Sequence, residues 1–275
     1  MAIVCATDFS PGAEHGLRTA AAFARACGER LLLVHVTDLG ALAWTGRKLQ
    51  DELSQAATAR LAEVAAGLAS GGLEVETRAL VGRPDERIGE LAREVSARLL
   101  VMGIVGHRPG PRWRVGSLAT RLARAVPAPV LLAADAAPFE ACAGGRRALR
   151  ALVAVDASAS GDAAAAALAS LRRLGACDAL LLHLCEPAGA ATARAELEAR
   201  FGAPAGPGTT EIRIEPAVRW LADQIALVAE QERADVVVVG GRQRSGLERI
   251  RQDSVSEALL RLAPASVLRA PAGGA

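Results

Sequence analysis

Aromatic residues are scarce in this chain: they make up 3% of its 275 residues, and tyrosine is absent. Lysine is also nearly missing, since Lys48 is the only one, and the formal net charge is +2. Proteins that bind nucleic acids usually combine a concentrated basic face with aromatic stacking platforms. We therefore expect no nucleic-acid partner.

Long hydrophobic runs and paired cysteines are missing as well. No apolar run reaches the roughly 18 residues of a membrane span, and a strand-like segment begins at Ile3 with no basic leader before it, so we expect no signal peptide. The five cysteines are odd in number and widely spaced, which is typical of reduced thiols and not of a disulfide framework or a zinc site. These absences predict a cytoplasmic protein without a membrane span and without metal-ligating residues.

What the sequence does contain is an internal repeat. Asp8 ends a short apolar segment and has its counterpart in Asp156, 148 positions later, and the next apolar segments keep this spacing. Gly103 and Gly240 end a later pair of apolar segments, which are 137 positions apart. The second copy is therefore shorter between its second and fourth strands, in a surface helix where changes of length are tolerated.

Within each copy, apolar runs alternate with helical patterns, which favours a parallel sheet covered on both faces. The first copy is expected to place strands at 2–7, 31–36, 73–80, 98–102 and 129–133, and helices at 12–27, 48–69, 84–96 and 116–125. In the second copy the corresponding long helix shrinks to 190–201. We predict an α/β fold of two tandem doubly wound domains, 1–135 and 150–275, each a five-stranded parallel sheet flanked by helices, with a linker at 136–149.

A glycine-spaced loop follows the fourth strand of the first copy. Gly103 and Gly106 are followed, after nine residues, by Gly116 and Ser117, where a helix is expected to begin. Ligands of open α/β sheets bind beyond the carboxyl ends of the strands, where the strand order reverses. Glycines allow the backbone to approach closely, and free N–H groups at a helix N-terminus attract an anion. The pattern predicts a phosphate-binding loop.

The same loop carries cationic side chains that suit a phosphate, namely His107, Arg108, Arg112 and Arg114. Two prolines, Pro109 and Pro111, remove N–H donors from it. The alternative is that this segment is only a solvated turn.

With these motifs the chain resembles the universal stress protein family in its tandem two-domain form. Nucleotide-binding members carry G-x2-G-x9-G-[S/T], which the loop satisfies, and the likeness extends to Ala6–Ser10, Val81–Pro84 and Val126–Leu131. The resemblance implies that ATP binds here, accompanied by Mg²⁺. It also implies that the last strands of the two domains, at 130–133 and 266–270, pair as a pseudo-dimer within one chain.

The resemblance assigns the parts of the nucleotide to particular positions. Asp8 and Val36 would meet the adenine, Ala6 and Gly103 would lie near the ribose, and the loop residues would hold the triphosphate. The whole expected set is Ala6, Thr7, Asp8, Val36, Met102, Gly103, Gly106, His107, Arg108, Gly116, Ser117 and Leu118.

The second copy departs from the motif where phosphate would bind. Gln243 replaces the second glycine, Asp253 replaces the third, and Trp220 falls within the altered Gly-x-Pro turn. A carboxylate within 4 Å of a like charge costs about 4 kcal/mol at an effective dielectric constant near 20. We expect this copy to bind ATP poorly or not at all, although its arginines leave room for another anion: Arg242, Arg244, Arg249 and Arg251.

Several of these residues also have a simpler structural interpretation. Asp156 is better explained as a cap of the following helix, whereas Asp8 stands beside an intact loop and is expected to contact a ligand. His35 and His183 lie at matched strand ends and are expected to be packed or hydrogen-bonded structural residues. Cys5 and Cys185 are expected to be small core residues rather than redox centres.

The resemblance implies an ATP-binding regulator of stress or signalling, with the nucleotide in the N-terminal domain only, and a homodimer of the two-domain chain with an unidentified protein partner. Two alternatives stay open, a nucleotide-free interaction module and a slow ATPase. The chain has no G-x-x-x-x-G-K-[S/T] loop and no readable catalytic constellation, so we name no catalytic residue and expect at most slow hydrolysis. No G-x-G-x-x-G follows the first strand of either copy, which disfavours a dinucleotide-binding domain.

Overall fold

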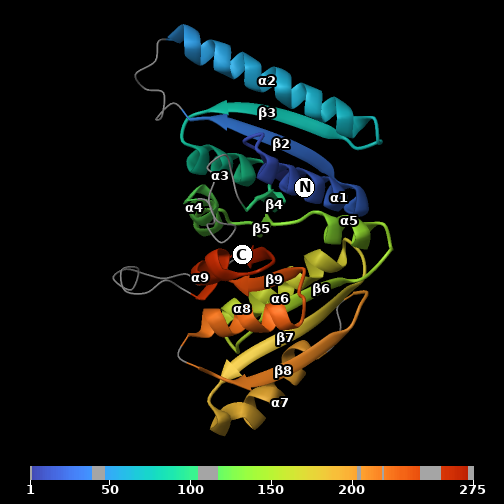
Figure 1. The fold of residues 1–275 in the computed structure, drawn as a ribbon, viewed down its shortest axis with the longest axis vertical. Coiled ribbons are helices and arrows are strands. Elements are labelled where there is room, and N and C mark those ends of the chain that lie inside the picture. The colour runs from blue at the N-terminus through green and yellow to red at the C-terminus, as the bar shows by residue number, and fades with distance from the viewer. Residues whose placement is uncertain are drawn as a thin grey trace. The chain divides into compact units, whose positions relative to one another are not determined.

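The computed structural model of the chain describes residues 2–38, 47–104, 117–202, 206–218, 220–241 and 255–271. These residues form two compact units, the first ending at Ala136 and the second beginning at Ala137 (Figure 1). Each unit is built on a parallel sheet with helices packed against it. In the described part of the chain, no helix is long and apolar enough to cross a membrane.

Unit 1 is a five-stranded sheet in the order β3-β2-β1-β4-β5. Its strands are β1 (Ala2–Ala6), β2 (Arg30–Thr37), β3 (Val75–Val81), β4 (Ala97–Gly103) and β5 (Val130–Ala133). Its helices are α1 (Pro11–Cys27), α2 (Arg47–Ala69), α3 (Pro84–Glu94) and α4 (Ser117–Ala125). The chain adds strands outward from β1 to β3 and then resumes on the other side of β1 with β4. The strand order therefore reverses between β1 and β4, where ligands of such folds bind.

The first turn of unit 1 shows how the sequence sets these elements. Every residue of β1 is buried, as expected for a strand covered on both faces. Ser10 then caps α1, since its Oγ accepts a hydrogen bond from the Ala13 N–H at 3.1 Å, and Pro11 occupies the first helical turn. Gly28 ends the helix in the left-handed region, with φ of 63°.

Unit 2 repeats this plan in the order β8-β7-β6-β9-β10. Its strands are β6 (Leu149–Ala154), β7 (Cys177–Cys185), β8 (Thr210–Pro216), β9 (Val236–Gly240) and β10 (Ser266–Ala270). Its helices are α5 (Ala137–Ala143), α6 (Ala159–Arg172), α7 (Ala190–Phe201), α8 (Leu221–Gln231) and α9 (Val255–Leu262), with a short 3-10 helix, η1 (Pro187–Gly189), before α7.

Equivalent strands pair in the same register in the two units. Ile3 on β1 lies opposite Leu31 on β2, and the residues 148 positions later, Ala151 and Ala179, lie opposite each other on β6 and β7. Even an unusual backbone conformation is repeated, because Ser96 and its counterpart 137 positions later, Arg233, both have positive φ. The predicted α/β class with two tandem doubly wound domains is confirmed.

Differences from the sequence prediction are small and have local causes. The segment 136–149 contains α5, which was expected to be linker, because its apolar face buries Phe139 and Cys142. β3 begins at residue 75 and not 73, after a turn in which Gly72 has φ of 78°. The predicted short helix at 190–201 is confirmed as α7, which has 12 residues against 23 in α2.

Candidate functional site

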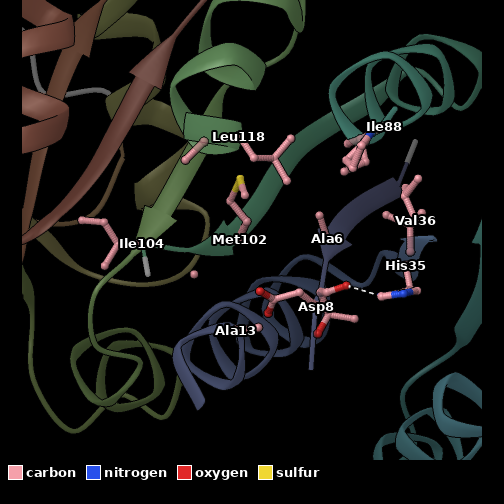
Figure 2. Close-up of a pocket in the computed structure, with 14 residues that line it drawn as sticks. Ala6, Asp8, Ala13, His35, Val36, Ile88, Met102, Ile104 and Leu118 are labelled. Atoms are coloured by element: carbon pink, nitrogen blue, oxygen red, sulfur yellow. Dashed lines mark hydrogen bonds between the residues drawn. The ribbon is translucent and has the colours of Figure 1, made fainter. Parts of the chain in front are cut away.

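A pocket of about 170 Å³ opens in unit 1 at the carboxyl ends of β1, β2 and β4. This is the place where the strand order reverses. Figure 2 shows it with residues from strands and helices on all sides. It is lined by Ala6, Thr7, Asp8, Ala13, Val34, His35, Val36, Pro84, Ile88, Met102, Gly103, Ile104, Leu118 and Ala119.

The walls of the pocket are mainly apolar. Val36 comes from the end of β2, Ile88 from α3 and Met102 from the end of β4, and Figure 2 shows all three around the same space. Leu118, in the first turn of α4, adds a further apolar side chain. An apolar cleft with a few polar groups is the usual form of a small-molecule site.

The loop after β1 supplies the polar edge of the pocket and is tightly held. Asp8 Oδ1 accepts a hydrogen bond from the Ser10 N–H at 3.0 Å, and Thr7 Oγ1 accepts one from the Phe9 N–H at 3.0 Å. Phe9 has φ of 61°, a conformation that costs a bulky residue free energy and needs support from its surroundings. These bonds supply that support and hold the carboxylate of Asp8 at the pocket.

His35 anchors the same loop from β2. Its Nδ1 lies 2.9 Å from the Thr7 carbonyl oxygen, and because a carbonyl can only accept, Nδ1 carries the proton. The imidazole stacks on the Phe9 ring with centroids 4.7 Å apart. The Arg60 guanidinium carbon lies 5.3 Å from the centroid of the same Phe9 ring. In unit 2, His183 Nδ1 makes the matching bond to the Val155 carbonyl at 2.9 Å. The prediction of hydrogen-bonded structural histidines is confirmed for both copies.

Gly103 is where β4 and α1 come closest. A Cβ at this position would lie 2.2 Å from the Gly12 carbonyl oxygen, so no side chain fits. The matched position in unit 2, Gly240, would place a Cβ 1.8 Å from the Ser160 carbonyl oxygen. The first glycine of the motif is thus required for helix packing in both units, which explains why the second copy keeps it while the later glycines differ.

Comparison with known proteins identifies the family. The model of the universal stress protein family matches residues 1–134 and 149–271, which together make up most of the chain. The chain belongs to the universal stress protein family. No curated protein sequence matches the chain significantly.

Solved structures agree with this fold. A universal stress protein from Archaeoglobus fulgidus DSM 4304 matches with a TM-score of 0.78 at 19% identity, covering 99% of this chain and 98% of that one. A functionally unknown protein from Pseudomonas aeruginosa PAO1 matches with a TM-score of 0.70 at 19% identity, covering 98% and 92% of the two chains. Another putative universal stress protein, from Pseudomonas aeruginosa UCBPP-PA14, gives 0.67 at 18% identity, covering 98% and 92%. At these identities the likeness concerns the fold alone.

In this universal stress protein, seven of the predicted site residues line the pocket: Ala6, Thr7, Asp8, Val36, Met102, Gly103 and Leu118. Ser117 is the first residue of α4. The other four predicted positions lie outside the described residues: Gly106, His107, Arg108 and Gly116. The same holds for the second copy's Arg242, Gln243, Arg244, Arg249, Arg251 and Asp253.

Sequence reasoning missed half of the pocket's lining. The residues it did not name are Ala13, Val34, His35, Pro84, Ile88, Ile104 and Ala119. Pro84 ends the Gly-x-Pro turn that carried part of the family resemblance, and Ile88 follows it on α3, so that motif was the available signal. His35 was expected to be structural and was not assigned to the site. The other missed residues are small or apolar and carry no chemical signature in the sequence: Ala13, Val34, Ile104 and Ala119.

Asp156, the counterpart of Asp8, also accepts a hydrogen bond from the N–H two residues later. Its Oδ1 accepts hydrogen bonds from the Ser158 N–H at 3.1 Å and the Gly161 N–H at 3.2 Å, and the Ser158 hydroxyl is bonded to the same atom. These donors belong to the start of α6, so the prediction of a helix-capping role for Asp156 is confirmed. Ser158 itself is the N-cap residue.

Cys5 is buried in β1, as predicted, whereas Cys185 at the end of β7 is only half-buried and is not a core residue. All five cysteines are free thiols, and burial raises the pKa of the Cys5 thiol to about 12. Within the described ranges, no group of three or more His, Cys, Asp or Glu side chains could hold a metal ion.

Proposed function

We propose that this protein binds ATP in unit 1 and acts as a nucleotide-dependent regulator of stress or signalling. The observation that carries the proposal is the apolar pocket at the reversal of strand order, between β4 and α4, the two elements that the glycine-spaced loop connects. A loop with this spacing suits phosphates, and the pocket beside it suits a base. A nucleotide would occupy both, with its base in the pocket and its phosphates at the loop.

The adenine would lie between the apolar walls. Val36, Ile88 and Met102 offer three faces for a flat ring, and Asp8 offers an acceptor for its exocyclic amine. The phosphates would then run toward the start of α4 at Ser117, where backbone N–H groups and the helix dipole favour negative charge. His107 and Arg108 of the loop would neutralise part of that charge.

Mg²⁺ would accompany the nucleotide. When bound, it would supply positive charge that offsets the negative charge of the phosphates. The described pocket residues offer only one carboxylate, Asp8, and we place this side chain at the adenine end. We therefore propose that the ion is carried by the triphosphate and its waters, in keeping with the preference of Mg²⁺ for phosphates and few protein ligands.

Unit 2 would not bind ATP. Val155 stands where unit 1 has Thr7, so unit 2 lacks the hydroxyl beside the carboxylate. Gln243 and Asp253 replace two glycines of the motif. The second unit would then serve as the structural partner of the first.

Titration calorimetry with Mg-ATP on nucleotide-stripped protein tests the proposal. Gly116→Asp copies the second unit's residue into the first, and we expect it to abolish the heat of binding. Gly189→Asp is the matched control in unit 2, because nothing lies within 4 Å of a Cβ there. Absence of binding by the unsubstituted chain would replace the proposal with a nucleotide-free interaction module, whereas turnover above about 1 per second would indicate a true enzyme.

We further propose a cytoplasmic homodimer of the two-domain chain, acting through a protein partner. The five free thiols are consistent with a reducing compartment. Light scattering that shows twice the 28.3 kDa chain mass would support the dimer, and a monomer at all concentrations would contradict it.

A further inference from the structure

An ion pair joins α3 to α4 beside the pocket. Arg121 on α4 donates from Nε to Asp85 Oδ2 on α3 at 3.0 Å, although the two residues are 36 positions apart. The Asp85 side chain is only 14% exposed, whereas that of Arg121 is 46% exposed. Arg83 reaches the same carboxylate oxygen from 3.5 Å. The carboxylate is therefore the shared acceptor at this junction, and Arg121 is its link to α4.

The ion pair joins two helices that both carry residues lining the pocket. Asp85 stands between Pro84 and Ile88, which line the pocket from the first turns of α3. One turn before Arg121 on α4 is Leu118, which lines the pocket from the other side. The bond thus fixes the separation between the wall made by α3 and the first turn of α4.

The repeat gives an internal comparison. The residues 137 positions after Asp85 and Arg121 are Ala222 on α8 and Ala258 on α9, so both partners are replaced by alanine in unit 2. The helices α8 and α9 still pack on each other without this bond. The pair is therefore not a requirement of the fold. Unit 1, which keeps the glycine spacing, has both partners of the ion pair, and unit 2 has neither.

We propose that Asp85 and Arg121 are positioning residues for nucleotide binding in unit 1. The inference rests on the proposed function and deepens it. A ligand held by the first turn of α4 and by the α3 wall must fix both, and a bond that already holds them together reduces the ordering cost of binding. Charge-assisted hydrogen bonds are suited to this because they are short and directional.

The direction in which Asp85→Ala changes the affinity for ATP distinguishes a positioning role from a purely electrostatic one. Asp85→Ala removes a negative charge close to the site of an anion, so electrostatics alone predicts tighter binding of ATP. Positioning predicts weaker binding, because α4 loses its link to α3. Arg121→Ala weakens binding under both accounts and is informative only together with Asp85→Ala.

The experiment is a double-variant cycle read by calorimetric titration of the full chain with Mg-ATP. We expect Asp85→Ala and Arg121→Ala each to raise Kd about tenfold, and the double variant to lose little more than either, since partners in one interaction do not act additively. Arg213→Ala is the control, because Arg213 donates to Glu232 at 2.7 Å in unit 2, away from the pocket. Melting temperatures verify that all variants are folded.

The outcomes are distinguishable. If the unsubstituted chain fails to bind Mg-ATP, the proposed function is overturned and this inference with it. If the chain binds but Asp85→Ala binds equally well or more tightly, the positioning role alone is overturned. Losses that multiply in the double variant would likewise show that Asp85 and Arg121 act separately.

Discussion

Replacing Gly103 by alanine tests the closest contact of the fold. The added Cβ would lie 2.2 Å from the Gly12 oxygen and 2.6 Å from the Gly12 carbonyl carbon. Carbon and carbonyl oxygen normally approach to about 3.3 Å, so α1 and β4 would have to separate by about 1 Å. Both contacting atoms are backbone, and no side-chain rotation can relieve them. Overpacking of this kind costs about 3 kcal/mol at the upper end of its usual range.

Differential scanning calorimetry measures this cost as a fall in the melting temperature of unit 1. For a domain of this size we expect a decrease of about 10 °C. Gly240→Ala should lower the melting temperature of unit 2 in the same way, since its Cβ would meet the Ser160 oxygen. Gly67→Ala on the exposed surface of α2 is the control, where nothing lies within 4 Å and a gain of about 0.5–1 kcal/mol is expected. A Gly103→Ala transition that overlays the unsubstituted one would refute the close approach.

Two further predictions concern ionisable groups. Only the half-buried thiols Cys27 and Cys185 should react with a thiol reagent at pH 8 in the native protein. Burial suppresses the thiolate form of the other three and raises the pKa of Cys5 to about 12. After unfolding, all five thiols should react. The Thr209 N–H and hydroxyl donate to Asp178 and hold the pKa of that carboxyl below its ordinary value of 3.8. A carboxyl with a lowered pKa stabilises the fold above its ordinary value and loses this contribution as the pH falls. Asp178→Asn should therefore cost about 1 kcal/mol at pH 7 in urea unfolding, with a difference that shrinks below pH 3.8.

The elements of the fold could be predicted because their signals are local. Strands such as β1 are short apolar runs, and α1 begins with serine and proline and ends with glycine. The change of spacing from 148 to 137 located the shortened helix, which the structure shows as α7.

The pocket could be predicted only in part, because its walls come from segments that are distant in sequence. Asp8 and Met102 lie at or just after the ends of strands and were named with the family resemblance, whereas Ile88 enters from a helix whose orientation depends on tertiary packing. The left-handed conformation of Phe9 has no sequence signal, because it is imposed by the bonds around it. The packing role of Gly103 was hidden too, since its partner is the backbone of α1.

We propose above that ATP binds unit 1 and not unit 2. Photoaffinity labelling with 8-azido-ATP, followed by peptide mapping, tests it directly because the reactive group sits on the adenine. The account predicts label on unit 1 peptides that contain pocket residues such as Val36 or Met102, removed by excess ATP, with unit 2 unlabelled. ATP-competable label on unit 2 peptides would contradict it, as would the absence of any competable label.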